Sequence, residues 1–311
     1  MKKWKCVMAI PGDAFYLSEQ VLAAQAAAEG LGVELSIVNA EMDSVTQSQQ
    51  LLSSVQSPTR TRPDAILLEP VNATGLPRVA EAAVAAGIAW AVSNALVDYL
   101  GALREKAKVP VFMVSQDHVE VGRIQGRQIG TLLPEGGSIL YLRGPVMSSV
   151  ATLRFEGLDA VRPKNVDMKV LKVQGATAEN ARDAVCSWLA LLMVRPEATN
   201  LIVSQNADFI MGARKAFETN TNEPHRSKWL SLPCMGVGIS KQIKPLVDQG
   251  TLCAAVLTSL TAHQALEMLV QGLKTGTQPP EQTFVEASPY PSIEELAKKR
   301  KARGHSHPTK V

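Results

Sequence analysis

The sequence predicts an α/β fold with two doubly wound lobes, each built on a parallel sheet, and a ligand cleft between the lobes. Short apolar stretches alternate with longer stretches rich in Ala, Glu, Gln and Leu along most of the chain, as when strands alternate with helices. Gly, Pro, Asn and Asp separate these stretches, as they do at the ends of strands and helices. The length of 311 residues favours about two domains.

The first forty residues introduce the repeating unit. Residues 5–10 predict a short buried strand, and the turn Pro11-Gly12-Asp13 follows it. Residues 15–31 predict a helix that ends at a glycine, and residues 33–38 predict a second strand. Strand, helix and strand in this order imply a parallel pair with a right-handed crossover. The first loop, residues 11–16, is therefore expected at the carboxyl edge of a sheet, where open α/β sheets bind ligands.

The same alternation continues along the chain in two series, the second beginning after residue 117. Further helices are predicted at residues 44–57, 76–86, 97–108, 119–133, 149–161, 178–193, 208–220, 241–249 and 261–273. Further strands are predicted at residues 64–69, 88–92, 109–114, 138–142, 169–173, 200–204, 234–237 and 253–257, and residues 284–286 are expected to close a sheet. Two series of this kind predict two doubly wound lobes linked by more than one crossing.

The composition is that of an ordinary globular protein. Apolar residues make up 46% and charged residues 20% of the chain. No apolar run reaches the ~18–20 residues of a membrane span. The basic start Met1-Lys2-Lys3 is followed by an apolar run of residues 6–10 only, so no signal peptide is predicted. Two alternatives follow: the protein stays inside the cell, or its export signal is missing from this sequence.

Positive charge is concentrated at the carboxyl end. Residues 290–311 hold six Lys or Arg and two Glu, so this tail carries +4, whereas the whole chain carries +3 and the rest −1. A nearly neutral body provides no electrostatic footprint for nucleic acid. The simplest interpretation of the tail is a solvated, partly frayed terminus, and a nucleic-acid or membrane-surface arm is the alternative.

Metal and cofactor motifs are absent from the sequence. The four cysteines, Cys6, Cys186, Cys234 and Cys253, show no zinc-binding spacing and predict buried, reduced thiols. The histidines of the tail, His305 and His307, are too sparse for a metal site. We therefore expect no metal and no cofactor.

Enzyme motifs are absent as well. The first strand is followed by Ile10-Pro11-Gly12-Asp13, which is neither a GxGxxG turn nor a P-loop, and no GxSxG nucleophile elbow occurs. The histidines His118, His225 and His263 have no evident nucleophile or metal partner. The sequence thus favours a binding protein over an enzyme.

Several short segments occur in an order typical of one family. They are Gly12 to Tyr16 (GDAFY), residues 23–32 (AAQAAAEGLG), residues 64–70 (DAILLEP), Ala86-Gly87-Ile88, residues 117–122 (DHVEVG), residues 154–158 (RFEGL), Asn206-Ala207-Asp208 and residues 235–238 (MGVG). Together, over roughly residues 5–287, they resemble the type I periplasmic-binding-protein superfamily. The likeness is closest to the ribose-binding-like sugar receptors of ABC transporters, which share their core with LacI-type regulators.

The resemblance implies a division into lobes. Three crossings are expected, near residues 114–118, 236–240 and 257–261. The amino lobe would comprise residues 1–115 and 239–258, the carboxyl lobe residues 116–238 and 259–289, and the basic tail residues 290–311. Gln116 and Asp117 would then lie at the hinge about which such receptors close.

The resemblance also implies ligand-binding residues, because these receptors hold ligands by polar and aromatic side chains at strand ends. Each of several candidates also has an alternative, structural role. Asp13 and Asn206 could cap a helix N-terminus, and Phe15 and Tyr16 could pack in the core. Asn94 could be an ordinary turn residue, and Arg154 could pin its helix. The implied ligand-binding residues are Asp13, Phe15, Tyr16, Ser93, Asn94, Arg154, Asn206, Gly238 and Thr258.

The chain departs from the family pattern at three places. Gly238 replaces an Asp that sugar receptors commonly carry, Thr258 stands near the position of an expected Gln or Asn, and the Arg usually found near residues 149–152 is missing. The charged clamp around a pyranose is therefore largely absent. A less hydroxylated or more apolar ligand than ribose or a common hexose follows as an expectation.

The function implied by the resemblance is capture of a small polar, sugar-like ligand in the cleft between the lobes. The partner would be an ABC transporter permease or a sensor, and the compartment would be the periplasm. The alternative is the core of a LacI-type transcriptional regulator. That class needs a helix-turn-helix ahead of the first strand, where this sequence has only residues 1–4.

Overall fold

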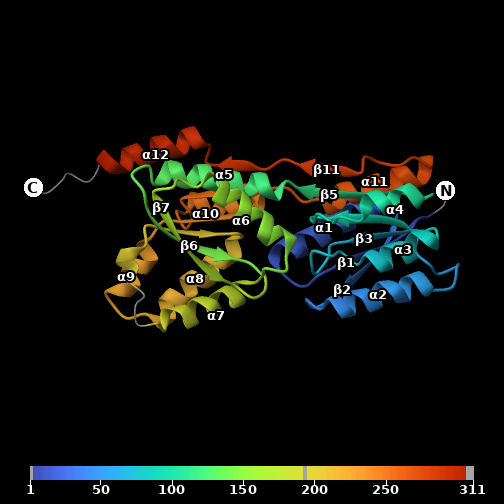
Figure 1. Ribbon diagram of the computed structural model, residues 1–311, viewed down its shortest axis with the longest axis horizontal. Helices are drawn as coiled ribbons and strands as arrows, with labels where there is room; N and C mark the ends of the chain where they lie inside the picture. Colours follow the sequence, from blue (N-terminus) through green and yellow to red (C-terminus); the bar gives the residue numbers. More distant parts are fainter. Residues whose placement is uncertain (1–2, 192–194, 306–311) are drawn as a thin grey trace, which may run out of the picture. The chain divides into compact units, whose positions relative to one another are not determined.

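The computed structural model describes residues 3–191 and 195–305 (Figure 1). The described chain forms two compact units. Unit 1 comprises Met1–Gln116, Met147–Val150 and Leu260–Val285, and unit 2 comprises Asp117–Val146, Ala151–Ser259 and Glu286–Val311. Each unit contains one six-stranded sheet, which confirms the predicted α/β class with two doubly wound lobes.

The sheet of unit 1 is parallel throughout, with the order β11-β5-β4-β3-β1-β2. Its strands are β1 (Lys5–Ile10), β2 (Glu34–Asn39), β3 (Ala65–Leu68), β4 (Ala89–Ser93), β5 (Val111–Gln116) and β11 (Gln282–Val285). Its helices are α1 (Phe15–Leu31), α2 (Ser44–Gln56), α3 (Pro77–Ala85), α4 (Leu100–Lys106) and α11 (Ala262–Thr275).

The two faces of this sheet carry separate cores. Helices α1 and α11 cover one face, and α2, α3 and α4 cover the other (Figure 1). The chain leaves β1 toward the first face and β3 toward the second, so the winding direction changes between these neighbouring strands. Ligands of open α/β sheets bind at the carboxyl side of such a switch point.

The sheet of unit 2 has the order β12-β10-β9-β8-β6-β7, in which only the edge strand β12 is antiparallel among the described strands. Its strands are β6 (Gly137–Arg143), β7 (Val166–Lys172), β8 (Leu201–Ser204), β9 (Cys234–Ile239), β10 (Ala254–Thr258) and β12 (Ser288–Tyr290). Its helices are α5 (His118–Leu132), α6 (Ser149–Val161), α7 (Ala178–Leu189), α8 (Ala207–Asn220), α9 (His225–Ser231), α10 (Ser240–Asp248) and α12 (Ile293–His305), with a 3₁₀ turn at Pro196–Ala198.

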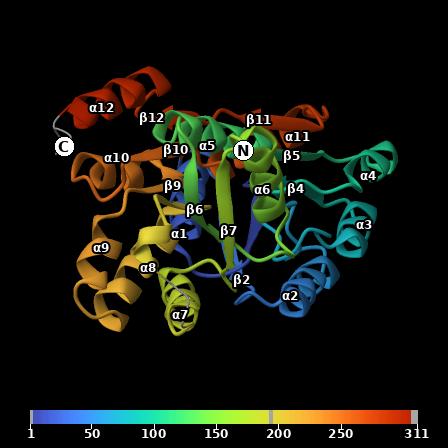
Figure 2. The ribbon, with the colours of Figure 1, turned by 60° about the vertical axis from the view of Figure 1, so that its left-hand side comes forward.

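The two faces of this second sheet also carry separate cores. Helices α7 and α8 cover one face, where Trp188 and Phe217 pack against Trp229. Helices α5, α6 and α12 cover the other face (Figure 2). Tyr141 and Leu296 are buried there. The winding direction changes between β6 and β8, which is the second switch point.

The division into units differs from the predicted one mainly after residue 238, and Gln116 and Met147–Val150 also belong to unit 1 rather than to the carboxyl lobe. Strand β10 pairs in parallel with β9, so residues 254–258 belong to unit 2 rather than to the amino lobe. Helix α11 packs on α1, and β11 pairs with β5, so most of residues 259–289 belong to unit 1 rather than to the carboxyl lobe. The chain changes unit after Gln116, Ser259 and Val285, and also on either side of the short stretch Met147–Val150. None of these changes lies near residues 236–240, so the crossing expected there is wrong.

The basic tail also differs from its prediction as a frayed terminus. Strand β12 and helix α12 occupy its first part, and α12 packs on α5 through the buried side chain of Leu296. Residues 306–311 of the predicted tail, and residues 192–193 of the helix predicted at 178–193, lie outside the described residues. Helix α9 has no counterpart among the predicted elements.

Candidate functional site

The carboxyl edge of the unit 1 sheet brings together residues at the ends of four strands. Asp13 follows β1, Glu69 follows β3, Asn94 follows β4, and Gln116 ends β5. The backbone N–H of Glu69 donates to Ala9 O at 2.9 Å, which places the ends of β1 and β3 side by side. The switch point is thus lined by carboxyl and amide groups, which can accept and donate hydrogen bonds.

Two residues of the first loop are exposed at this edge. Asp13 Oδ1 accepts a hydrogen bond from Asn39 Nδ2 at 3.0 Å. The N-cap of α1 is Ala14, without a side-chain cap, so the alternative role of Asp13 as a helix cap is wrong. Phe15 begins α1 and is 38% exposed, so it presents an aromatic surface instead of packing in the core.

A buried hydrogen-bond network holds Tyr16 and Ser93. Tyr16 Oη accepts from Gln20 Nε2 and from Gln116 Nε2, both at 2.9 Å. Ser93 Oγ and Thr261 Oγ1 are 2.7 Å apart, and Gln20 Oε1 accepts from the backbone N–H of Thr261 at 3.0 Å. Gln20 therefore ties α1 to the start of α11, a role that periodicity alone does not indicate. Ser93 is fully buried in this network, which gives it a structural partner.

Glu69 and Asn94 form a buried pair that the sequence reasoning missed. Asn94 Nδ2 donates to Glu69 Oε1 at 2.8 Å, and only 5% of Glu69 is exposed. Burial raises the pKa of the Glu69 carboxyl to about 7, and the hydrogen bond from Asn94 opposes the rise. The available signal was an acid directly after the apolar stretch of residues 65–68, just before Pro70.

In unit 2, Arg154 connects α6 to two neighbouring segments. Its Nε donates to His118 Nδ1 at 3.3 Å, and its Nη1 donates to Gln205 O at 2.7 Å. Gln205 in turn accepts from the backbone N–H of Gly144 at 2.8 Å and donates to Ala151 O at 2.6 Å. The alternative role of Arg154 in pinning its helix is thus supported by geometry, and Gln205 is a further residue that the motifs did not reveal.

The remaining predicted residues of unit 2 lie just after β8, within β9 and at the end of β10. Asn206 Oδ1 accepts from the backbone N–H of Phe209 at 2.9 Å, so the alternative role as N-cap of α8 is confirmed. A Cβ at Gly238 would lie 2.6 Å from Gln242 Oε1, so the Asp of the family pattern does not fit there unless Gln242 moves. Thr258 ends β10 and is buried.

A carboxyl group, that of Asp208, also lies in unit 2, at the start of α8. Gln242 Nε2 donates to Asp208 Oδ1 at 2.7 Å, and burial, as the largest effect, raises the pKa of Asp208. A ligand role for each of the nine predicted residues stays a prediction, since the hydrogen bonds above show only what each contacts within its own unit.

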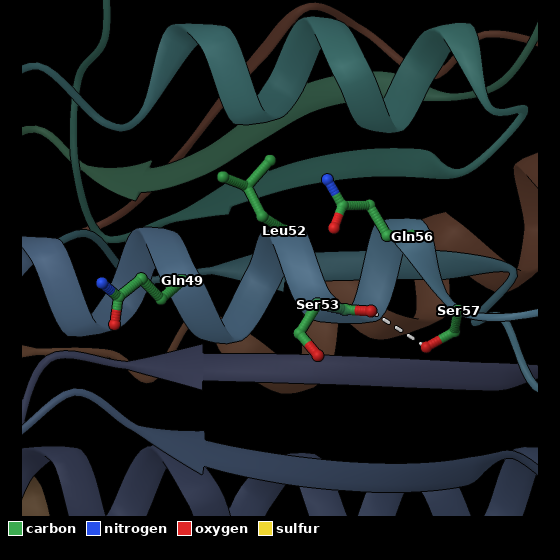
Figure 3. A pocket seen from close by; sticks show the side chains of 5 residues that line it. All are labelled: Gln49, Leu52, Ser53, Gln56 and Ser57. Carbon is green, nitrogen blue, oxygen red and sulfur yellow. Dashed lines mark hydrogen bonds between the residues drawn. The ribbon is translucent and has the colours of Figure 1, made fainter.

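A hollow elsewhere in unit 1 provides fewer converging polar groups than the carboxyl edge of the sheet. Figure 3 shows an open hollow along α2, lined by Gln49, Leu52, Ser53, Gln56 and Ser57. All five belong to one helix or to its C-cap, so no second element contributes a converging polar group. Within residues 3–191 and 195–305 there is no cluster of metal-binding side chains, and no helix there is both long and apolar enough to span a membrane.

Comparisons with known proteins agree on one family. A family profile described as a periplasmic binding protein domain matches residues 7–277. No curated protein matched the sequence. A solved galactofuranose-binding protein aligns with a TM-score of 0.79 at 20% identity, covering 97% of this chain and 99% of its own.

Two further solved structures are similar. A protein from Mycobacterium smegmatis in complex with β-D-fucofuranose has a TM-score of 0.77 at 17% identity, with 97% and 96% of the two chains covered. An ABC transporter solute-binding protein from Bacillus halodurans with bound myo-inositol has a TM-score of 0.75 at 16% identity, with 96% and 98% covered. These likenesses show the fold, and the profile match over most of the sequence shows that the chain belongs to the periplasmic binding protein family.

Proposed function

We propose that this protein captures a small sugar or polyol and presents it to an ABC transporter or a sensor. The observation that carries the proposal is the carboxyl edge of unit 1, where the carboxyl and amide groups of Asp13 and Asn94 lie at the same edge as the exposed ring of Phe15. Sugars need planar acceptors and donors for their hydroxyl groups and an aromatic surface for their C–H faces.

The similar solved structures support this ligand class. Their names include galactofuranose, β-D-fucofuranose and myo-inositol, which are furanoses and a polyol. A furanose or polyol also agrees with the missing pyranose clamp that the sequence indicates. None of these three names mentions a transcriptional regulator, and the LacI-type alternative is not favoured.

We further propose a periplasmic location, as the family name implies, and a role without catalysis. In this proposal Arg154, Asn206, Gly238 and Thr258 of unit 2 are further ligand contacts. A permease or a sensor protein would be the macromolecular partner, and nucleic acid would not be one.

The test is thermal unfolding in the presence of L-arabinose, D-galactose, D-fructose, D-fucose, D-allose or myo-inositol. A ligand at about 100 times its Kd should stabilise the native state by about 2.7 kcal/mol, which corresponds to a rise in Tm of about 4 °C at this size. Asp13→Ala and Phe15→Ala should abolish the rise. Asn206→Asp keeps the oxygen that caps α8 but loses the amide donor, so it should weaken the rise without unfolding the helix.

Glu34→Ala is the matched control, because Glu34 is an exposed acid at the start of β2, at the opposite edge of the same sheet. It should leave the rise unchanged. The proposed function is contradicted if none of the six compounds raises the Tm of the unsubstituted protein.

A further inference from the structure

The Glu69 carboxyl is an unusual group to bury at the end of a strand. Glu69 Oε1 accepts from Asn94, whereas Oε2 has no hydrogen-bond partner among the described residues. A buried carboxyl that lacks a full set of partners destabilises the folded state. Glutamine would fit the same space without this cost, so the carboxyl invites a functional explanation.

The backbone around Glu69 is held firmly. Gln47 of α2 donates from Nε2 to Glu69 O at 2.9 Å and accepts at Oε1 from the backbone N–H of Val71 at 3.0 Å. Together with the hydrogen bond to Ala9 O, these contacts fix the turn after β3. The carboxyl is therefore presented at one place, next to the end of β4.

Asn94 is equally constrained. Its backbone φ is 56°, in the left-handed region that Asn tolerates better than most residues, and its side chain is buried. The amide has two different ends, an acceptor oxygen and a donor nitrogen, and a rotation of half a turn exchanges them. Whichever end faces Glu69, the other end faces away from it.

The protonation state of Glu69 limits which end of the Asn94 amide can face it. An ionised carboxylate only accepts hydrogen bonds, so it requires the nitrogen of Asn94 to face it, whereas a protonated carboxyl can also donate to the oxygen. Among the described residues, Gln47 of α2 and Asn94 after β4 are the side chains that hydrogen-bond to Glu69, and neither titrates. No charged group contributes to the pKa shift, and the acid of the neighbouring loop, Asp13, is bonded to Asn39.

We propose that Glu69 is a positioning residue: its carboxylate orients the Asn94 amide so that the oxygen of Asn94 is offered to a hydroxyl donor of the ligand. This inference rests on the proposed function, since it assigns the ligand group that Asn94 meets. If the inference holds, ligand affinity depends on pH through Glu69, although Glu69 need not touch the ligand. The ligand must then carry a hydroxyl at this position, not only an acceptor such as an ether oxygen.

The expected size of the pH effect follows from the fractions of Glu69 that are protonated and ionised at each pH. With the pKa at about 7, most Glu69 is protonated at pH 6 and ionised at pH 8. If protonation lets the amide turn freely, affinity is about twofold weaker at pH 6, and if it enforces the other orientation, about tenfold weaker. If the Glu69 carboxyl has a structural role only, the Kd at pH 6 should equal the Kd at pH 8.

The experiment compares Kd at pH 6 and pH 8 by calorimetry, for the tightest of the six compounds named above. Glu69→Gln can accept or donate at either pH, so its affinity should be independent of pH and weaker than that of the unsubstituted protein at pH 8. Glu69→Asp keeps a titrating group but shortens its reach toward Asn94, so it should also lose the pH effect. Glu105→Gln removes an exposed glutamate of α4 and should keep the original ratio.

The outcomes separate the two proposals. An unsubstituted protein whose Kd is the same at both pH values, or a Glu69→Gln variant that keeps the original ratio, overturns the inference while leaving the proposed function standing. Loss of the ratio in Glu105→Gln overturns it as well, since the effect then originates elsewhere. Failure of all six compounds to bind at both pH values overturns the proposed function and this inference together.

Discussion

At the scale of single residues, the burial of Glu69 has a consequence for stability that is independent of any ligand. Its pKa is about 7 in the folded protein, above the 4.5 of an ordinary glutamate. Because the folded carboxyl holds its proton to higher pH, the folded state loses stability as pH rises from 4.5 to 7 and is less stable by a constant amount above that. The difference corresponds to about 3 kcal/mol.

Glu69→Gln should remove this dependence. We expect the free energy of urea unfolding of the variant, relative to that of the unsubstituted protein, to be about 3 kcal/mol higher at pH 8 than at pH 4.5. Contributions from all other titrating groups cancel in that difference. Glu105→Gln, an exposed glutamate of the same sheet unit, should show no gain, and an equal stability difference for Glu69→Gln at both pH values would contradict the assigned burial.

Individual side chains also show why the motifs could indicate a site but not its contacts. The motifs placed Ser93 and Asn206 at strand ends, which is where both lie. They could not show that Ser93 is engaged by Thr261, 168 residues away, or that Asn206 caps α8. Glu69 was missed because its significance depends on burial and on Asn94, and neither can be read from an acid that follows four apolar residues.

At the scale of elements, close contacts between helices depend on glycines. A Cβ at Gly122 of α5 would lie 2.1 Å from Arg154 O of α6, and a Cβ at Gly157 of α6 would lie 2.0 Å from Val119 O of α5. The two backbones therefore touch directly at this crossing. A methyl group at either position requires the helices to separate, which disturbs the packing around Leu158.

Gly122→Ala should therefore destabilise unit 2, although alanine favours a helix by about 1 kcal/mol over glycine. We expect a net loss of about 1–3 kcal/mol in urea unfolding, since overpacking typically costs that much or more. Gly30→Ala is the matched control: it changes a glycine of α1 whose added Cβ would meet no atom within 4 Å beyond its chain neighbours and the backbone of its own helix. This variant should stabilise the protein by up to about 1 kcal/mol. An equal gain for both variants would show that the helices separate without cost.

Elements were predicted well where periodicity is strong and poorly where packing decides. The strands and most helices of the first 116 residues follow their predicted ranges closely, because each is bounded by Gly, Pro, Asn or Asp. The basic tail looked solvated, since charges dominate residues 294–301. One buried leucine in that run, Leu296, docks α12 on α5, and a single apolar residue gives no periodic signal.

At the scale of the whole molecule, the order of strands limited what the sequence could establish. Residues 234–237 and 253–257 were both recognised as strands, but propensity does not say which neighbour a strand pairs with. Their parallel pairing, with Ala255 opposite Gly236, places both in unit 2, and the chain passes from β10 into unit 1 after Ser259. The number of lobes could be predicted from the repeated unit, whereas the division of residues 239–289 required the structure.

Each unit has cores of its own on both faces of its sheet, so each should unfold as a separate cooperative step. Trp90 is buried in unit 1 and Trp229 in unit 2. Variants that keep only one of these tryptophans, with the others replaced by Phe, should therefore report two different urea midpoints in the absence of ligand. Gly122→Ala should lower the midpoint reported by Trp229 and leave that reported by Trp90 unchanged.

The same pair of reporters decides whether one ligand uses both units. A compound bound by residues of unit 1 and unit 2 stabilises both native units, so both midpoints should rise when it is added. A compound bound by the carboxyl edge of unit 1 alone should raise only the Trp90 midpoint, and Arg154, Asn206, Gly238 and Thr258 would then be excluded as contacts. Coincident midpoints without ligand would show instead that the two units unfold as one, and the assignment of independent cores would be wrong.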